Sequence, residues 1–218
     1  MEKLEPALDS LPLFPLPDVT LFPGVPVALH VFEPRYREML RDCLATHRSL
    51  ALVQIVGTND DGTPQLARVA GAGIIVRHEP QGDGRSNIVV MGRARVKLDE
   101  LPFEPPYRRA RASILHDLDE HVPEARKVAL ISAATRFLSE NRKPGSDFEL
   151  GLPEDGGTRA GEIADILAHQ LVLAADTRQE ILECLGPSER VRRVTEALSQ
   201  QSAMFLRLRG GGSSRTLN

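Results

Sequence analysis

The chain has 218 residues, of which 41% are hydrophobic and 26% are charged, and its formal net charge is −3. This composition is typical of a globular protein with enough apolar residues for one large core or two smaller ones. It excludes an overall electrostatic attraction to nucleic acid or to an anionic membrane, and no apolar run is long enough to span a bilayer.

The N-terminus and the cysteines indicate the cellular compartment. Met1–Ser10 is acidic and lacks the apolar segment of a secretory signal peptide. Cys43 and Cys184 are too few for the disulfide framework of a small secreted domain. We therefore expect a cytoplasmic protein without a membrane segment.

The first half of the chain has the short apolar runs that are typical of β-strands. A proline- and glycine-rich turn at Phe22-Pro23-Gly24 separates the first two runs, and Gly71 and Gly73 predict a bend in a later one. The expected strands are Leu11–Leu16, Val25–Phe32, Leu50–Val56, Leu66–Arg77, Asn87–Leu98 and Tyr107–Leu115.

One helix is expected among these strands, and it begins at Pro34 because proline is favoured in the first turn of a helix. Its apolar residues recur at helical spacing, so this stripe should pack on the sheet. The stripe consists of Tyr36, Met39, Leu40, Cys43, Leu44 and His47.

The second half of the chain changes to the helical period. Lys143–Gly157 is rich in proline and glycine and is expected to be a loop, and Gly186-Pro187 fits the end of one helix and the start of the next. The expected helices are Pro123–Asn141, Gly161–Leu173, Asp176–Leu185 and a last helix from Pro187 to about Arg209.

Three segments near the N-terminus carry a resemblance to a known family. They are Leu11-Pro12-Leu13-Phe14-Pro15-Leu16, then Leu21-Phe22-Pro23-Gly24, then Val31-Phe32-Glu33-Pro34-Arg35-Tyr36. In this order and spacing they resemble the opening signature of the N-terminal, substrate-binding domain of Lon proteases. The resemblance extends over later strands and helices and covers roughly Leu11 to Arg209.

The resemblance implies an α+β fold. Residues 8–117 would form a PUA-like β-barrel with one packed helix, residues 118–209 a C-terminal α-helical bundle, and residues 210–218 a flexible tail. In Lon proteases this domain is thought to help capture unfolded or tagged substrates. The expected partners are therefore polypeptide clients, together with a separate ATPase or protease that would act on them.

The sequence also indicates what chemistry to expect. The P-loop pattern G-x-x-x-x-G-K-[ST] and the nucleophile pattern G-x-S-x-G do not occur in it. We therefore expect a stand-alone, non-enzymatic protein-recognition module that needs no cofactor. An enzyme whose catalytic groups meet only in the folded chain stays open as an alternative.

Two places are candidates for peptide or partner binding. Phe22 and Pro23 could form an exposed apolar turn that holds a peptide, although a turn whose phenylalanine points inward fits the sequence equally well. Glu33, Arg35 and Tyr36 could form a recognition surface at the start of the helix. The structural alternative, which we favour, is that Glu33 caps the helix, Tyr36 packs and Arg35 forms an ion pair.

Arginines on two neighbouring strands give an alternative function. Strand alternation places Arg93 and Arg95 on one face, and Arg109 and Arg111 on one face of the next strand. If these strands pair, the four arginines could follow the phosphates of an RNA, as PUA-like folds include RNA binders. Only nine Phe and Tyr residues and no Trp are present for base stacking, so nucleic acid is the less favoured partner.

A polar segment between the two halves carries side chains of the kinds that bind metal ions. His116, Asp117, Asp119, Glu120 and His121 have suitable ligand types. Their spacing matches no common metal motif, and a solvated linker has the same composition. We therefore expect no metal.

Overall fold

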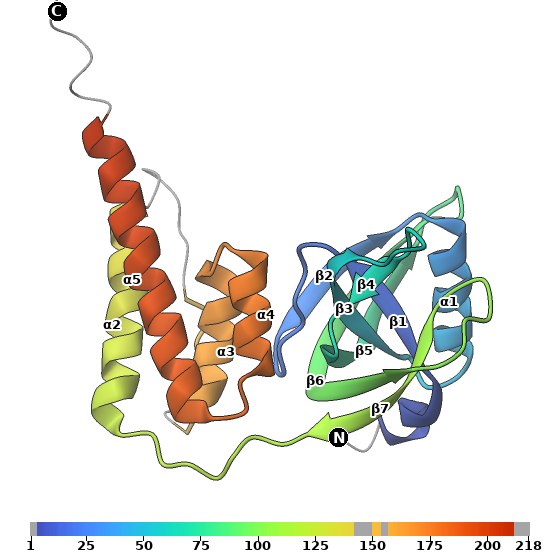
Figure 1. Ribbon diagram of the computed structural model, residues 1–218, viewed down its shortest axis with the longest axis horizontal. Helices are drawn as coiled ribbons and strands as arrows, with labels where there is room; N and C mark the ends of the chain where they lie inside the picture. Colours follow the sequence, from blue (N-terminus) through green and yellow to red (C-terminus); the bar gives the residue numbers. More distant parts are fainter. Residues whose placement is uncertain (1–3, 142–149, 154–156, 212–218) are drawn as a thin grey trace, which may run out of the picture.

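The chain folds into a β-rich half and a helical half, which lie side by side and are joined by an extended connection (Figure 1). The computed structural model describes residues 4–141, 150–153 and 157–211. Most of the expected loop over residues 143–157 lies outside these residues. So does the expected tail over residues 210–218, except Gly210 and Gly211, which belong to the last helix.

The described part of the β-rich half contains a sheet of seven strands, preceded by the 3-10 helix η1 (Glu5–Ser10). The hydrogen-bonded order is β1-β7-β6-β5-β3-β4, and β2 pairs with β6 beside this path. The strands are β1 (Leu11–Leu16), β2 (Pro26–Val31), β3 (Ser49–Thr58), β4 (Pro64–Leu66), β5 (Val69–Pro80), β6 (Ser86–Glu100) and β7 (Arg109–Leu115).

Strand β1 connects the two sides of this sheet. It pairs antiparallel with β7 and parallel with β3, so the path of paired strands β1, β7, β6, β5 and β3 returns to its start. Leu13 on β1 and Val53 on β3 belong to one buried apolar cluster, and Phe14 and Leu52 belong to another. Both faces of β1 and β3 are thus covered, which explains their continuous apolar sequence.

The long strand that was expected over residues 66–77 is divided in two. β4 ends at Leu66 and β5 begins at Val69, because the chain changes partners between them. The N–H of Ala67 donates to the carbonyl of Gln54 on β3 (3.0 Å), and the carbonyl of Arg68 accepts from Leu98 on β6 (2.8 Å). The bend expected near Gly71 and Gly73 coincides with a shift in the β5–β6 register between Ala72 and Gly73.

Helix α1 (Pro34–Ala45) packs on the β-rich half, on the side away from the helical half (Figure 1). It begins at the expected proline. The ring of Tyr36 lies 4.4 Å from the ring of Phe14 on β1. The expected apolar stripe is confirmed at its centre, where Tyr36, Met39, Leu40 and Cys43 are buried.

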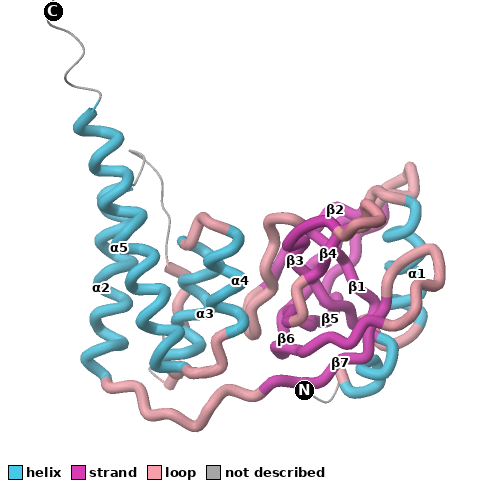
Figure 2. Tube along the Cα trace, viewed as in Figure 1, coloured by secondary structure: helices cyan, strands magenta, loops and turns pink. Residues whose placement is uncertain are grey.

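The helical half consists, among the described residues, of α2 (Glu124–Asn141), α3 (Ala160–Leu171), α4 (Ala175–Glu183) and α5 (Pro187–Gly211). Helices α3 and α4 lie next to the β-rich half, and α2 and α5 lie on the far side (Figures 1 and 2). The protein is therefore α+β, with strands and helices largely separated along the chain. None of the described helices combines the length and apolar character needed to cross a membrane.

Candidate functional site

The turn at Phe22-Pro23-Gly24 lies in a loop between the two halves. The N–H of Val25 donates to the carbonyl of Phe22 (3.2 Å), and Gly24 has a φ of +78°. Pro23 and Gly24 therefore occupy the central positions of a type II turn, where proline and glycine are the favoured residues. The turn expected from the sequence is confirmed.

Phe22 does not form the exposed apolar contact that one of the two sequence interpretations required. Its side chain is 0% exposed and packs in the core of the helical half, together with Leu130, Leu167 and Val194. The preceding residue, Leu21, is equally buried in the core of the β-rich half. Burying a phenylalanine stabilises a fold by about 1.5–3 kcal/mol, so the inward position is favoured wherever a neighbouring core can accept the ring.

Two glycines allow the loop to lie directly on the sheet. A Cβ atom on Gly71 would collide with the carbonyl oxygen of Leu21, and one on Gly92 would collide with the carbonyl oxygen of Phe22. Gly92 also exchanges main-chain hydrogen bonds with the turn, since its carbonyl accepts from Gly24 and its N–H donates to Val25 (both 3.0 Å). The loop over residues 17–25 therefore inserts Leu21 into the core of the β-rich half, and Phe22 and Val25 into the core of the helical half.

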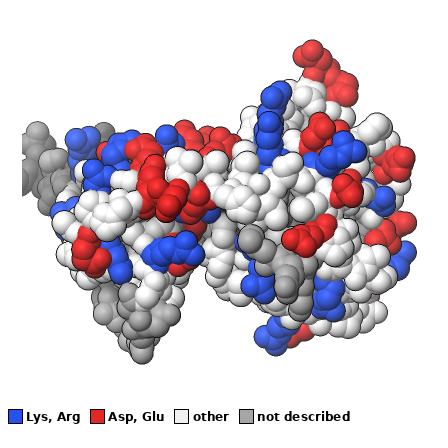
Figure 3. Space-filling model, turned by 90° about the horizontal axis from the view of Figure 1, so that it is seen from below, with Lys and Arg blue, Asp and Glu red and all other residues white. Residues whose placement is uncertain are grey.

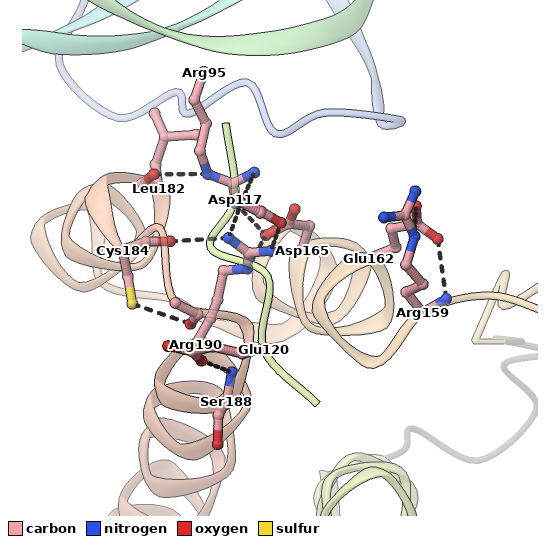
Figure 4. Close-up of polar contacts among 11 residues, drawn as sticks. Arg95, Asp117, Glu120, Arg159, Glu162, Asp165, Leu182, Cys184, Ser188 and Arg190 are labelled. Atoms are coloured by element: carbon pink, nitrogen blue, oxygen red, sulfur yellow. Dashed lines mark hydrogen bonds and ion pairs between the residues drawn. The ribbon is translucent and has the colours of Figure 1, made fainter. Parts of the chain in front are cut away.

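A buried ion cluster lies close to this loop and joins five segments (Figure 4). Arg95 on β6 donates to Asp165 on α3 (2.5 Å) and to the carbonyl of Leu182 on α4 (2.8 Å). Arg190 on α5 lies 3.1 Å from Asp165 and donates to both oxygens of Asp117 in the connection between the halves. Two arginines and two aspartates thus balance each other's charge, which burial requires.

Electrostatics keep the cluster ionised at its outer end. Burial raises the pKa of Asp117, but the hydrogen bond from Arg190 and the charges of Arg190 and Arg95 outweigh it and hold that pKa below its usual value. Burial lowers the pKa of Arg190, while Asp117 and Asp165 raise it above the ordinary arginine value overall. The pair of Asp117 and Arg190 is therefore a fixed electrostatic link between the connection and α5, whereas burial raises the pKa of Asp165 against the opposing charges of Arg95 and Arg190.

A cleft of about 610 Å³ opens beside this cluster, between the middle of β6, the end of β7 and the starts of α2 and α3. Its walls carry charged side chains of both signs, among them Arg93, Lys127 and Glu124. The partly buried Pro23 also lines the cleft. The lining residues that the structure describes include no serine or cysteine that could act as a nucleophile. Many of the charged side chains in the cleft form ion pairs with one another. We therefore regard the cleft as a structural feature and not as a binding site for a charged ligand.

A second set of contacts joins the halves at α3 and α4. Arg178 donates to the carbonyl of Asp18 (2.6 Å) and also to the carbonyls of Val172 and Leu173 at the end of α3. His169 on α3 is partly buried beside Arg178; burial and then the Arg178 charge lower its pKa, and a hydrogen bond to the main chain of Thr20 opposes them. This histidine therefore stays neutral over a wider pH range than a free one.

Glu33, Arg35 and Tyr36 have the structural roles that the sequence favoured, with one difference. Tyr36 is buried against the sheet, and Arg35 lies over its ring, 4.6 Å from the centroid. Glu33 is the N-cap residue of α1, but its side chain accepts from Arg35 (2.9 Å) instead of capping the helix. These residues hold the corner between β2 and α1.

An exposed aromatic residue at this corner was not singled out from the sequence. Phe32 is 56% exposed, and its ring lies 6.0 Å from that of His30 in a stacked arrangement. Strand alternation contained the signal, because Val27, Leu29 and Val31 are apolar at inward positions and Phe32 falls on the other face. An exposed phenylalanine beside an open strand is a candidate contact for an apolar ligand.

The expected arginine face does not form. Arg95 is 3% exposed and points into the ion cluster, because the helical half covers this side of β6. Arg109 lies over the ring of Tyr107 (4.8 Å), whereas Arg111 lies opposite Asp99 on β6. On the face seen from below, basic and acidic side chains are interspersed over both halves (Figure 3).

The polar segment over residues 116–121 has a structural role in the connection between the halves. Asp117 binds Arg190, and Glu120 accepts from the N–H of Ser188 at the start of α5 (3.3 Å). Among the described residues, no group of three or more His, Cys, Asp or Glu side chains is arranged to hold a metal ion.

Comparisons with known proteins identify similar chains. A family model described as the ATP-dependent protease La (LON) substrate-binding domain matches residues 10–200. A Lon protease from Roseiflexus castenholzii is 27% identical over 88% of this chain, and one from Methylocella silvestris is 26% identical over 92%. The chain spans about a quarter of the length of these relatives, 24% and 25% respectively.

Solved structures share the fold. A Lon N-terminal domain protein from Xanthomonas campestris superposes with a TM-score of 0.63 and 24% identity, and covers 85% of this chain and 96% of its own. The N-terminal domain of a Mycobacterium avium complex Lon protease has a TM-score of 0.58 and 14% identity. The match covers 87% of this chain and 98% of that domain.

Proposed function

Because this chain belongs to the family of Lon substrate-binding domains, we propose that it recognises polypeptide segments and does not cleave them itself. The observation that carries this proposal is the match of the family model to residues 10–200, nearly the whole chain. The clients would be unfolded or specific proteins, and a separate ATPase or protease in the same compartment, the cytoplasm, would act on them.

The geometry supports a binding role at the β2–α1 corner. Phe32 is exposed there on a rigid support, because Glu33 and Arg35 form an ion pair (2.8 Å) and Tyr36 packs in the core. Phe22 is unavailable as a surface contact since the helical half covers it. We therefore assign the apolar contact of the recognition surface to Phe32.

The same family membership supports the finer architecture that we propose. The closed path of paired strands is best interpreted as a PUA-like β-barrel covering residues 8–117, with α1 packed on it. Residues 118–209 would be the helical bundle. What supports this division is the separate apolar core of the four C-terminal helices, in which Phe22 and Val25 are the members from the β-rich half.

A titration with an unfolded polypeptide tests the function. The probe is a fluorescently labelled model protein that is reduced and carboxymethylated so that it stays unfolded, and binding is followed by fluorescence anisotropy. We expect saturable binding that persists at about 0.5 M salt. Salt at about this concentration would strongly weaken binding that depended on contacts with phosphates. No binding by the intact chain would refute the proposal.

Two matched variants test the surface. Phe32→Ala and Phe103→Ala each remove one exposed phenylalanine, and the two side chains are 56% and 63% exposed. We expect Phe32→Ala to weaken binding by about tenfold, as loss of an apolar anchor costs about 1–2 kcal/mol. Phe103→Ala should leave binding unchanged, and an equal loss in both variants would contradict the assignment.

A further inference from the structure

Strand β2 is an open edge of the sheet. Of the strands that the structure describes, it pairs with β6 alone, from Pro26 opposite Met91 to Val31 opposite Ser86. An open edge presents unpaired main-chain donors and acceptors to any chain that can lie alongside it.

The turn before β2 determines which residues face this edge. Gly24, with its positive φ, donates to the carbonyl of Gly92, and the N–H of Gly92 donates to Val25, so Gly24 and Val25 form a β-bulge opposite Gly92. Because antiparallel partners alternate, every second residue after Val25 directs its main chain to β6, namely Val27, Leu29 and Val31.

The main-chain groups of Ala28 and His30 therefore point away from β6. Both residues are exposed, and outside the ladder with β6 no hydrogen bond among the described residues uses their N–H or C=O groups. Pro26, the remaining outward residue, lacks an N–H group and thus fits an edge position. Two complete pairs of donors and acceptors are left available to a ligand.

The side chains along the edge indicate what kind of segment can bind. The exposed residues of β2 and the residue after it are Pro26, Ala28, His30 and Phe32, so the edge carries no Lys, Arg, Asp or Glu. Sheet edges that must avoid pairing are commonly protected by such charges, especially by lysine. An unprotected edge next to the stacked rings of His30 and Phe32 fits an uncharged, extended segment.

We propose that β2 binds an extended, uncharged polypeptide segment as an additional β-strand, with an aliphatic or aromatic side chain of that segment packed on His30 and Phe32. This inference rests on the proposed function and names its chemistry. Main-chain groups are common to all polypeptides, so strand addition recognises unfolded segments with little regard to their sequence. A folded client, whose main chain is already paired, would be ignored.

Amide hydrogen exchange measured by NMR tests the edge directly. In the free protein, the amides of Ala28 and His30 should exchange rapidly, while those of Val27, Leu29 and Val31 are protected by β6. Adding the carboxymethylated model protein should slow exchange at Ala28 and His30 at least fivefold. Slow exchange at both amides in the dilute free protein would overturn the proposal, because the edge would already be covered.

A pair of variants at one position separates the main chain from the side chain. Ala28→Pro removes the outward N–H and leaves the ladder with β6 intact, whereas Ala28→Thr keeps the N–H and is a good strand former. We expect Ala28→Pro to weaken binding of the model protein about fivefold to tenfold, and Ala28→Thr to bind like the wild type. Circular dichroism melting of both variants identifies any loss of folding.

The outcomes distinguish this inference from the proposed function. If the wild type binds the model protein and folded Ala28→Pro binds it equally well, the strand-addition proposal is wrong and polypeptide recognition stands. If the wild type does not bind at all, both fail. If the Ala28 and His30 amides become protected as protein concentration rises without a probe, a second copy occupies the edge, which also overturns the proposal.

Discussion

At the scale of single residues, the ion cluster of Arg95, Asp165, Arg190 and Asp117 shows where sequence reasoning stops. Alternation along β6 placed Arg95 on the face opposite its neighbours Ala94 and Val96, but could not reveal that α3 and α4 cover this face. The partners of Arg95 are Asp165 and the carbonyl of Leu182, 70 and 87 residues away. No local sequence pattern indicates such a pairing. Arg95 would be expected on the solvent-exposed surface from its sequence, but it is 3% exposed.

The central carboxylate of this cluster should be essential for stability. Asp165→Asn leaves Arg95 and Arg190 buried with only Asp117 as a charged partner, and breaking a buried ion pair in this way costs about 3–5 kcal/mol. We expect a loss of that size in the free energy of unfolding, measured with urea. The control is Glu162→Gln on the same helix. It removes the exposed ion pair between Glu162 and Arg159, which should contribute under about 1 kcal/mol to stability. Equal effects in the two variants would contradict a structural role for the cluster.

His169 should make stability depend on pH. Its folded pKa lies below the ordinary value of about 6.5, mainly because of burial and then because of Arg178. Between these two pKa values the unfolded chain binds a proton that the folded chain does not. The contribution is therefore fully present above pH of about 6.5 and is lost as the pH falls toward the folded pKa.

His169→Gln tests this dependence by urea unfolding at several values between neutral and mildly acidic pH. The variant should lose less stability on acidification than the wild type. Some dependence should remain, because burial also lowers the pKa of His47. A wild-type slope in the variant would show that His169 titrates alike in the folded and unfolded chains.

At the scale of elements, most of the strands and helices could be predicted, because each is determined by local periodicity and by proline and glycine. The expected starts of α1 at Pro34 and α5 at Pro187 are those of the structure, and β1 has its expected bounds. Helix η1 was not predicted, since its six residues are too few to establish a helical period. The division of β4 from β5 was also missed, because it follows from a change of pairing partner.

The close contact between the loop and the sheet requires Gly92. A methyl group at this position would collide with the carbonyl oxygen of Phe22, so Gly92→Ala should displace the loop and destabilise the protein by about 3 kcal/mol. The matched control is Gly82→Ala, which meets no atom within 4 Å and should change stability by under about 0.5 kcal/mol. Thermal melting of both variants measures the two changes in stability. A Gly92→Ala protein as stable as the wild type would show that the loop can move away from the sheet without loss of stability.

At the scale of the whole molecule, the resemblance in the opening segments predicted the α+β class and the order of the two halves. It could not predict how the halves meet, because the Phe22-Pro23-Gly24 turn permits both an exposed and a buried phenylalanine. The helical half decides between them by offering Phe22 a place in its core. The candidate binding surface consequently moves from this turn to the β2–α1 corner, which the helical half leaves open (Figure 1).

The same turn should make the two halves unfold as one unit. Leu21 and Phe22 belong to different cores, so neither core can open without disturbing the loop between them. In the wild type the calorimetric and van't Hoff enthalpies of unfolding should therefore agree. Phe22→Ala removes the larger of the two apolar side chains that this loop places in the helical core. It should lower stability by about 3–5 kcal/mol and split the heat-capacity peak in two, with the helical half melting first. A single, merely shifted peak would show that the remaining contacts, namely the ion cluster, the hydrogen bond from Arg178 to Asp18 and the packing of Val25, are enough to couple the halves.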